Sequence, residues 1–227
     1  MLKPLLVTAL CAALPAISQP ATAGPMGFKD SVMAMGDFNN NWRESFINYA
    51  ITPRDALGVS ATYMRADDTD KTRTLEELTY TRRLARWNMP HAQANLWFMG
   101  GIGALQGEDK NVNRNGIVTD HSFDKVMVKP GVQFDYETTR VYFAATHRLY
   151  RATDINHDYT AMRAGFSFYE AEYDQTQPWF ILEARNMNGL SDKTEITPML
   201  RFINKNFFIE AGVNNYREPR FNFMYIF

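Results

Sequence analysis

The chain has 227 residues, of which 45% are hydrophobic, 22% charged and 14% aromatic. Its 25 acidic and 24 basic side chains leave a formal net charge of −1, which excludes a generic nucleic-acid binder because such proteins carry a clear basic excess. The aromatic content excludes a disordered chain. The mean hydropathy of −0.36 is that of a soluble protein, so a membrane-crossing part has to be sought in the pattern of the sequence.

The first 23 residues have the three parts of a secretory signal peptide. Residues 1–3 include a lysine, residues 5–14 are apolar, and Ala21-Thr22-Ala23 forms a small-x-small cleavage site ahead of Gly24. The apolar stretch is too short to cross a bilayer as a helix, which needs about 20 residues. We therefore expect residues 1–23 to be removed on export, together with Cys11, and residues 24–227 to form a single domain without disulfides.

From residue 28 onward, apolar side chains recur at every second position. A period of two predicts β-strands, because successive side chains of a strand point to opposite faces, whereas a helix needs spacings of three and four. The pattern predicts an all-β fold of about twelve strands, with ten as the lower bound. In chain order the predicted strands are 28–36, 42–51, 57–63, 77–81, 93–102, 126–135, 140–146, 163–168, 180–185, 195–202, 207–214 and 220–227.

The connections between these strands form two sets that differ in length. The first set comprises 52–55, 87–91, 136–139, 172–178 and 203–206, and the second comprises 37–41, 66–73, 107–123, 152–158, 189–193 and 215–218. The second set holds the longest connection, which is typical of the outer side of a transmembrane antiparallel up-and-down β-barrel. A soluble β-sandwich is the alternative fold. Pro130 and Pro198 fall within predicted strands, where we expect bulges or strand ends.

The last residues, Phe221-Asn222-Phe223-Met224-Tyr225-Ile226-Phe227, resemble the C-terminal strand signal of Gram-negative outer-membrane β-barrels. The resemblance implies a monomeric barrel in the outer membrane, in contact with lipid and lipopolysaccharide. It also implies that the barrel-assembly machinery reads Phe223, Tyr225 and Phe227. The chain is similar in length to small twelve-stranded porins for acidic oligosaccharides, and it loosely resembles solitary autotransporter-like barrels. Few residues precede the first strand, so we expect no passenger domain.

In a barrel, side chains of one parity along each strand face the lumen. Parity predicts a lumen with five acidic and seven basic side chains. Such a lumen favours a narrow, porin-like channel for small solutes or ions. The alternative is a plugged, structural barrel in which the charges only neutralise one another. The predicted lumen residues are Glu77, Lys129, Asp135, Arg140, Arg148, Arg163, Glu183, Arg185, Glu195, Arg201, Glu210 and Arg220.

Most methionines of the predicted strands share this inner parity. Thioether sulfur is a soft ligand, so a role with soft metal ions such as copper or silver is a further alternative. Methionine also fills irregular gaps between bulky side chains, which explains the same pattern without a metal. The candidate ligands are Met64, Met99, Met127, Met187, Met199 and Met224, with Met33 and Met35 also inward and Met162 outward.

An outer-membrane hydrolase is the last alternative. Asp154, His157 and Asp158 share one predicted outer connection, and Asp120 and His121 lie in the longest one. A solvated polar loop explains these residues equally well, so we assign no catalytic residue. The chain has no Gly-rich phosphate loop and no cysteine metal site, and we expect no cofactor and no nucleic-acid partner.

Overall fold

The structure is a computed structural model that describes residues 24–66, 71–112, 118–172 and 174–227. The predicted signal peptide, residues 1–23, lies outside the described residues. No helix in the described part of the chain is long and apolar enough to span a membrane. In chain order the strands are β1 (Val32–Phe38), β2 (Trp42–Ala50), β3 (Asp55–Arg65), β4 (Lys71–Met89), β5 (Ala92–Val112), β6 (Val118–Val128), β7 (Gly131–Thr138), β8 (Val141–Ala152), β9 (Ile155–Ser167), β10 (Gln177–Asn188), β11 (Thr194–Asn204), β12 (Phe207–Val213) and β13 (Pro219–Ile226).

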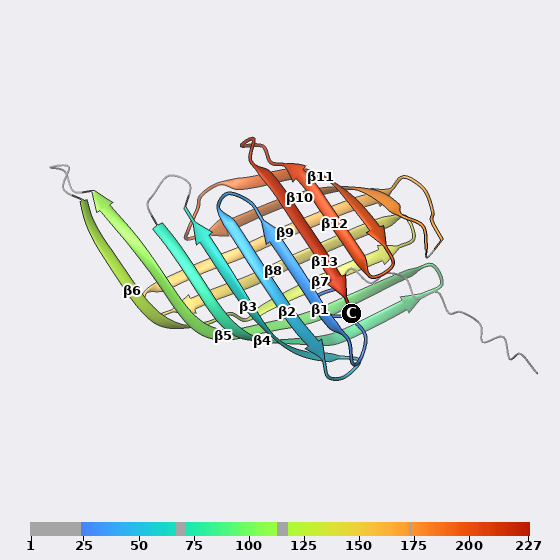
Figure 1. The fold of residues 1–227 in the computed structure, drawn as a ribbon, viewed down its shortest axis with the longest axis horizontal. Coiled ribbons are helices and arrows are strands. Elements are labelled where there is room, and N and C mark those ends of the chain that lie inside the picture. Colours follow the sequence, from blue (N-terminus) through green and yellow to red (C-terminus); the bar gives the residue numbers. More distant parts are fainter. Residues whose placement is uncertain (1–23, 67–70, 113–117, 173) are drawn as a thin grey trace, which may run out of the picture.

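The strands form one antiparallel sheet that closes on itself (Figure 1). The first and last strands pair with each other, from Met33 opposite Ile226 to Phe38 opposite Phe221. Strands β6 and β7 follow one another along β5 and are the two halves of one interrupted strand. The described chain is therefore a closed twelve-strand barrel. The predicted all-β barrel is confirmed, and the sandwich is wrong.

The interruption between β6 and β7 lies at Pro130, where a disturbance was expected. Proline has no N–H to donate to the ladder, and the strand bounds stop at Val128 and resume at Gly131. The register does not shift, because the Lys129 N–H donates to the Gly101 carbonyl at 2.8 Å and the Gly101 N–H donates to the Lys129 carbonyl at 3.0 Å. Pro130 thus ends a strand segment without forming a bulge.

Pro198 behaves differently, because it stays inside β11 opposite Leu182 and no bulge forms. The ladder between β11 and β12 begins one residue later, at Met199, so no hydrogen bond to β12 is required of the proline. An irregularity that was not predicted occurs in β4, where the register against β5 shifts between Arg83 and Ala85. This bulge is a local feature of backbone pairing, which period-two alternation does not reveal.

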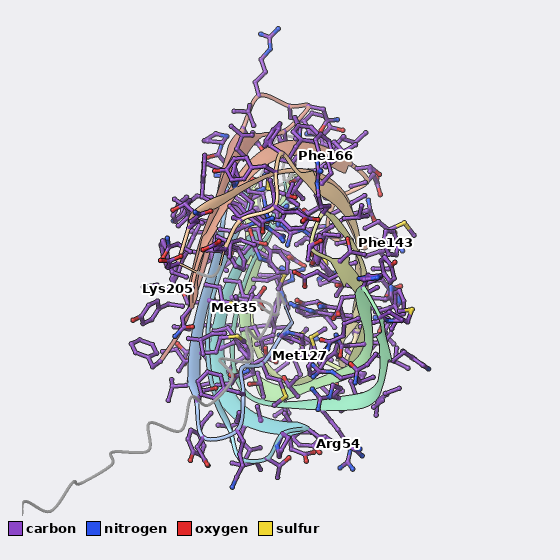
Figure 2. The ribbon with its side chains drawn as sticks, turned by 90° about the vertical axis from the view of Figure 1, so that its right-hand side faces the viewer. Met35, Arg54, Met127, Phe143, Phe166 and Lys205 are labelled. Atoms are coloured by element: carbon purple, nitrogen blue, oxygen red, sulfur yellow. The ribbon has the colours of Figure 1, made fainter. Side chains whose placement is uncertain are left out.

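The two faces of the barrel wall differ in polarity. Large apolar side chains such as Leu57, Leu78 and Val126 are exposed on the outer face. Figure 2 shows Phe143 on the outer side of the wall and Met127 inside the ring of strands. The low mean hydropathy is therefore the average of an apolar outer surface and an inner one that carries the buried charged side chains among apolar ones.

Candidate functional site

The interior of the barrel is the candidate site, and it is layered along the barrel axis. We call the end where β1 begins and β13 finishes the terminal end, and the opposite end the distal end. Along β10, Met187 belongs to an apolar cluster at the distal end, Arg185 to a charged middle layer, and Ile181 to an apolar cluster at the terminal end. On β10 the charged layer is therefore bordered by apolar side chains toward both ends.

The middle layer is a set of ion-paired side chains that we call the lumen network. It contains equal numbers of basic and acidic side chains, each with at least one partner of opposite charge within 4.0 Å. A balanced set of this kind offsets the cost of holding charges away from bulk water. Its members are Lys129, Arg148, Arg163, Arg185, Arg201, Arg220, Asp37, Glu44, Glu77, Glu183, Glu195 and Glu210.

One part of the network joins β2, β4 and β8 through Lys129 and Glu44. The Lys129 ammonium pairs with Glu77 and lies 3.8 Å from Glu44 Oε1. Arg148 Nη1 donates to both oxygens of Glu44, at 3.1 and 3.2 Å. Because β2 and β8 are far apart around the sheet, the Arg148–Glu44 pair links separate parts of the wall across the lumen.

A second part is centred on Glu210 of β12, whose side chain is fully buried. Glu210 accepts hydrogen bonds from Arg163, from Arg201 Nε at 2.5 Å and from Asn222 Nδ2 at 2.7 Å. Arg163 Nε also lies 3.1 Å from Glu183 Oε2. One carboxylate thus serves two guanidinium groups from β9 and β11.

The third part contains Asp37 of β1, which binds Arg220 in a bidentate manner. Arg220 Nε donates to Asp37 Oδ1 at 3.1 Å and Nη2 donates to Oδ2 at 2.6 Å. Arg220 also pairs with Glu183, and Arg185 lies 2.8 Å from Glu195 Oε2. Bidentate guanidinium–carboxylate pairs fix geometry as well as charge, so this part ties the closing strands β1 and β13 to the rest of the lumen.

All lumen residues predicted by parity project into the interior except Arg140. Arg140 lies exposed in the turn between β7 and β8, with Nη2 3.4 Å from the Ser167 carbonyl oxygen. The prediction failed there because the alternation was continued past the end of a strand. Sequence reasoning also missed Asp37 and Glu44. The outward Ile47 of β2 could have set the parity that places Glu44 inside.

Asp135 is the exception to the balance of charges. It is 4% exposed, and the structure pairs no basic side chain of the described chain with it. Its carboxylate accepts hydrogen bonds from Asn95 Nδ2 at 2.6 Å and from Trp97 Nε1 at 2.5 Å. The nearest cation in this chain of contacts is Arg86, whose Nε donates to Asn95 Oδ1 at 2.7 Å.

The methionines divide between the apolar layers. Asn222 Nδ2 lies 3.9 Å from Met199 Sδ, so at least one sulfur already has a polar contact. In the described chain, no group of three or more His, Cys, Asp or Glu side chains is arranged to hold a metal ion. The six predicted metal-ligand candidates fall in three places: Met64, Met127 and Met187 lie in the distal layer, Met199 and Met224 in the terminal layer, and Met99 lines the cavity between them.

A cavity of about 150 Å³ remains in the middle of the lumen. Network side chains line it, and some keep part of their surface open to it: Asp37 is 22%, Arg148 20% and Arg163 19% exposed. Glu210, by contrast, is fully buried against the wall. The cavity therefore presents both signs of charge in a space large enough for a few water molecules or a small ion.

The distal end does not assemble the predicted Asp and His cluster. His157 and Asp158 lie within β9, so they are not loop residues and they face opposite sides of the wall. His157 is buried, and Arg73 Nε donates to its Nε2 at 3.4 Å. Asp154 is exposed in the turn before β9, and the side chain of Asp120 lies outside the described residues. The described residues thus form no acid–histidine set.

Comparisons with known proteins find similarity in shape only. No family model and no curated protein matches the chain. Among solved structures it is similar to the KdgM porin, with 11% identity, 86% of this chain and 98% of that chain covered, and a TM-score of 0.45. It is also similar to the N-terminal β-barrel domain of Pseudomonas aeruginosa OprF, with 13% identity, 88% and 100% covered, and a TM-score of 0.36. P. aeruginosa OccK8 (OprE) gives 8% identity, 88% and 67% covered, and a TM-score of 0.37.

The network predicts a large loss of stability when its most shared carboxylate is removed. Glu210→Gln leaves Arg163 and Arg201 without their common charge, and we expect the free energy of unfolding to fall by about 3–5 kcal/mol. Urea unfolding of the detergent-refolded barrel, followed by tryptophan fluorescence, measures this change. Asp154→Asn is the matched control, because its exposed pair with Lys125 at 3.9 Å should contribute little. Equal stability of Glu210→Gln and Asp154→Asn would contradict a stabilising network.

Proposed function

We propose that the protein is a porin-like barrel of the outer membrane with a narrow passage for small ions or solutes. The observation that carries this proposal is the central cavity, which is lined by partly exposed side chains of both charges. A lumen filled only for structural reasons would bury its charged groups as completely as it buries Glu210. The apolar outer face supplies the surface that a bilayer requires of such a barrel.

The passage should discriminate weakly between anions and cations. The basic excess expected from parity disappears once Arg140 is placed in a turn and Asp37 and Glu44 are placed inside. Rings of one charge make a pore selective, whereas alternating signs that neutralise each other do not. This argues against a lumen specialised for acidic solutes.

A plugged barrel without transport is the second candidate, and the distal layer favours it. Trp42, Leu75, Leu105 and Tyr150 fill the lumen beyond the network and are at most 5% exposed. Trp42 and Tyr150 meet edge to face, with ring centroids 6.3 Å apart. An apolar layer this tightly packed resists both water and ions, so the distal layer is the barrier to test.

The conductance of single barrels in a planar bilayer separates the two candidates. Wild-type protein should give small, weakly selective steps, and Trp42→Ala should give larger ones because it opens the distal layer. Leu78→Ala is the matched control, since Leu78 is 67% exposed on the outer face and its removal leaves the lumen unchanged.

Two outcomes would contradict the channel. If neither the wild type nor Trp42→Ala conducts ions although both are folded, the barrel is structural and not a channel. Strong anion selectivity would contradict the balanced lumen.

We also propose that the terminal end faces the periplasm and that the barrel-assembly machinery reads β13, with Phe223, Tyr225 and Phe227 as the signal. The aromatic side chains of β13 are outward, where a partner in the membrane can reach them: Phe227 is 66% exposed and Tyr225 is 41% exposed. The same outer face would contact lipid and lipopolysaccharide, with the barrel as a monomer.

Loss of the last aromatic side chain should impair assembly more than folding. Phe227→Ala is expected to lower the amount of barrel inserted in the outer membrane of cells several-fold, while refolding in detergent stays unchanged. Phe207→Ala is the control, because Phe207 is also an exposed aromatic at the terminal end and packs against Tyr225. Equal insertion of the two variants, measured by immunoblotting of membrane fractions, would argue against a terminal signal.

A further inference from the structure

The segment that precedes β1 lies inside the terminal end of the lumen. Gly24, Pro25 and Met26 are buried, and Met26 packs in a cluster with Trp97 and two alanines of β2 and β3. Asn48 Nδ2 donates to the Pro25 carbonyl at 2.9 Å. A segment of irregular backbone is thus held in place by both apolar packing and a buried hydrogen bond. We call residues 24–28 the N-terminal strap.

The strap meets the indole ring that binds Asp135. A methyl group built on Gly24 would stand 2.9 Å from Trp97 Cζ2 and 3.6 Å from Cε2, the ring carbon bonded to Nε1. Trp97 Nε1 donates to Asp135 Oδ2 at 2.5 Å. Gly24 and the Asp135 carboxylate therefore both lie against the Trp97 ring.

Asp135 lacks the basic partner that the other buried carboxylates of the lumen have. Each acidic member of the lumen network pairs with a lysine or arginine, whereas Asp135 receives neutral donors such as Asn95 and Trp97. Two cations stand nearby without reaching it: Arg86 binds Asn95, and the Arg83 guanidinium lies 5.8 Å from the centroid of the Trp97 ring. A buried carboxylate is stabilised most by a direct charged partner.

Cleavage at the expected site would create such a partner at Gly24. Hydrolysis of the Ala23–Gly24 peptide bond adds water, leaving a carboxylate on Ala23 and an amine on Gly24 that takes a proton from solvent at neutral pH. Before cleavage, the same nitrogen is an uncharged amide. The charge that could balance Asp135 is therefore absent from the precursor and present in the processed chain.

We propose that the α-ammonium group of Gly24, formed by signal-peptide cleavage, binds the Asp135 carboxylate and locks the N-terminal strap across the terminal end of the lumen. The site is a binding site for the chain's own new terminus, and it couples export to fixing of the strap. The proposal rests on cleavage before Gly24 and holds whether or not the barrel conducts.

The reactivity of the α-amine tests this pairing directly. Exported protein, purified as a folded barrel, is treated with an amine-acylating reagent at neutral pH, and the rate at Gly24 is followed by mass spectrometry of the N-terminal peptide. We expect Gly24 to react about tenfold more slowly in the wild type than in Asp135→Asn, because the ammonium form that Asp135 stabilises does not react. The substitution nearly preserves side-chain volume, so shielding by burial alone would leave the rate unchanged.

A second variant guards against misfolding of Asp135→Asn. One alanine inserted between Ala23 and Gly24 moves the charged group by one residue and alters no strand, and it should also restore fast acylation. Asp124→Asn removes an exposed acid of β6 and should react like the wild type. Equal rates in the wild type and both test variants, or an N-terminal mass that shows cleavage elsewhere, would overturn the proposal.

Discussion

Closure of the sheet is the constraint on which the rest of the structure depends. Once β1 pairs with β13, the first and last strands of the barrel have no open edge, and each strand presents one row of side chains outward and one row inward. The outer row can be apolar along its whole length because it faces away from the charged lumen. The inner row must fill a space of fixed width, and its side chains meet partners that are distant in the sequence.

Along the barrel axis, the inward side chains form layers of different polarity. Charged side chains occupy the middle, where Arg148 and Glu44 reach one another across the lumen. Apolar clusters lie on both sides of the charged middle and lower the local polarity around the charges. Ion pairs gain strength in such surroundings only when every charge has a partner, which explains the equal numbers of the lumen network and makes Asp135 stand out.

Alternation predicted the faces well, because a period of two directly reports which side of a strand a residue occupies. It placed Glu183, Arg185 and Arg201 inside from sequence alone, and it placed Met162 outside. It failed for Arg140, where the strand had ended.

The inward Asp37 was missed because the first strand was predicted to end at residue 36, which placed Asp37 in the connection 37–41. In the structure β1 runs to Phe38 and includes Asp37.

Whether the lumen is open or filled could not be predicted from the sequence. Whether Arg and Glu side chains line a pore or close it depends on which of them meet across the barrel, and those contacts join residues such as Asp37 and Arg220 that are far apart in the chain. The bulge in β4 and the position of the N-terminal strap are equally non-local. The alternation of side chains and the C-terminal strand pattern predict the wall of the barrel. The contacts inside the lumen follow from packing in three dimensions.

The central claim is that side chains narrow the lumen on both sides of its charged middle, so that a bulky reagent cannot reach it. Thiol labelling of single-cysteine variants tests it most directly, because Cys11 is the chain's one cysteine and is expected to leave with the signal peptide. Thr79 lines the cavity and is 8% exposed, whereas Asp124 is exposed on β6. A bulky, charged thiol reagent should label Asp124→Cys at once and Thr79→Cys only after the barrel is unfolded. Equal labelling of the two variants in the folded protein would show a lumen wide enough for the bulky reagent and contradict the account.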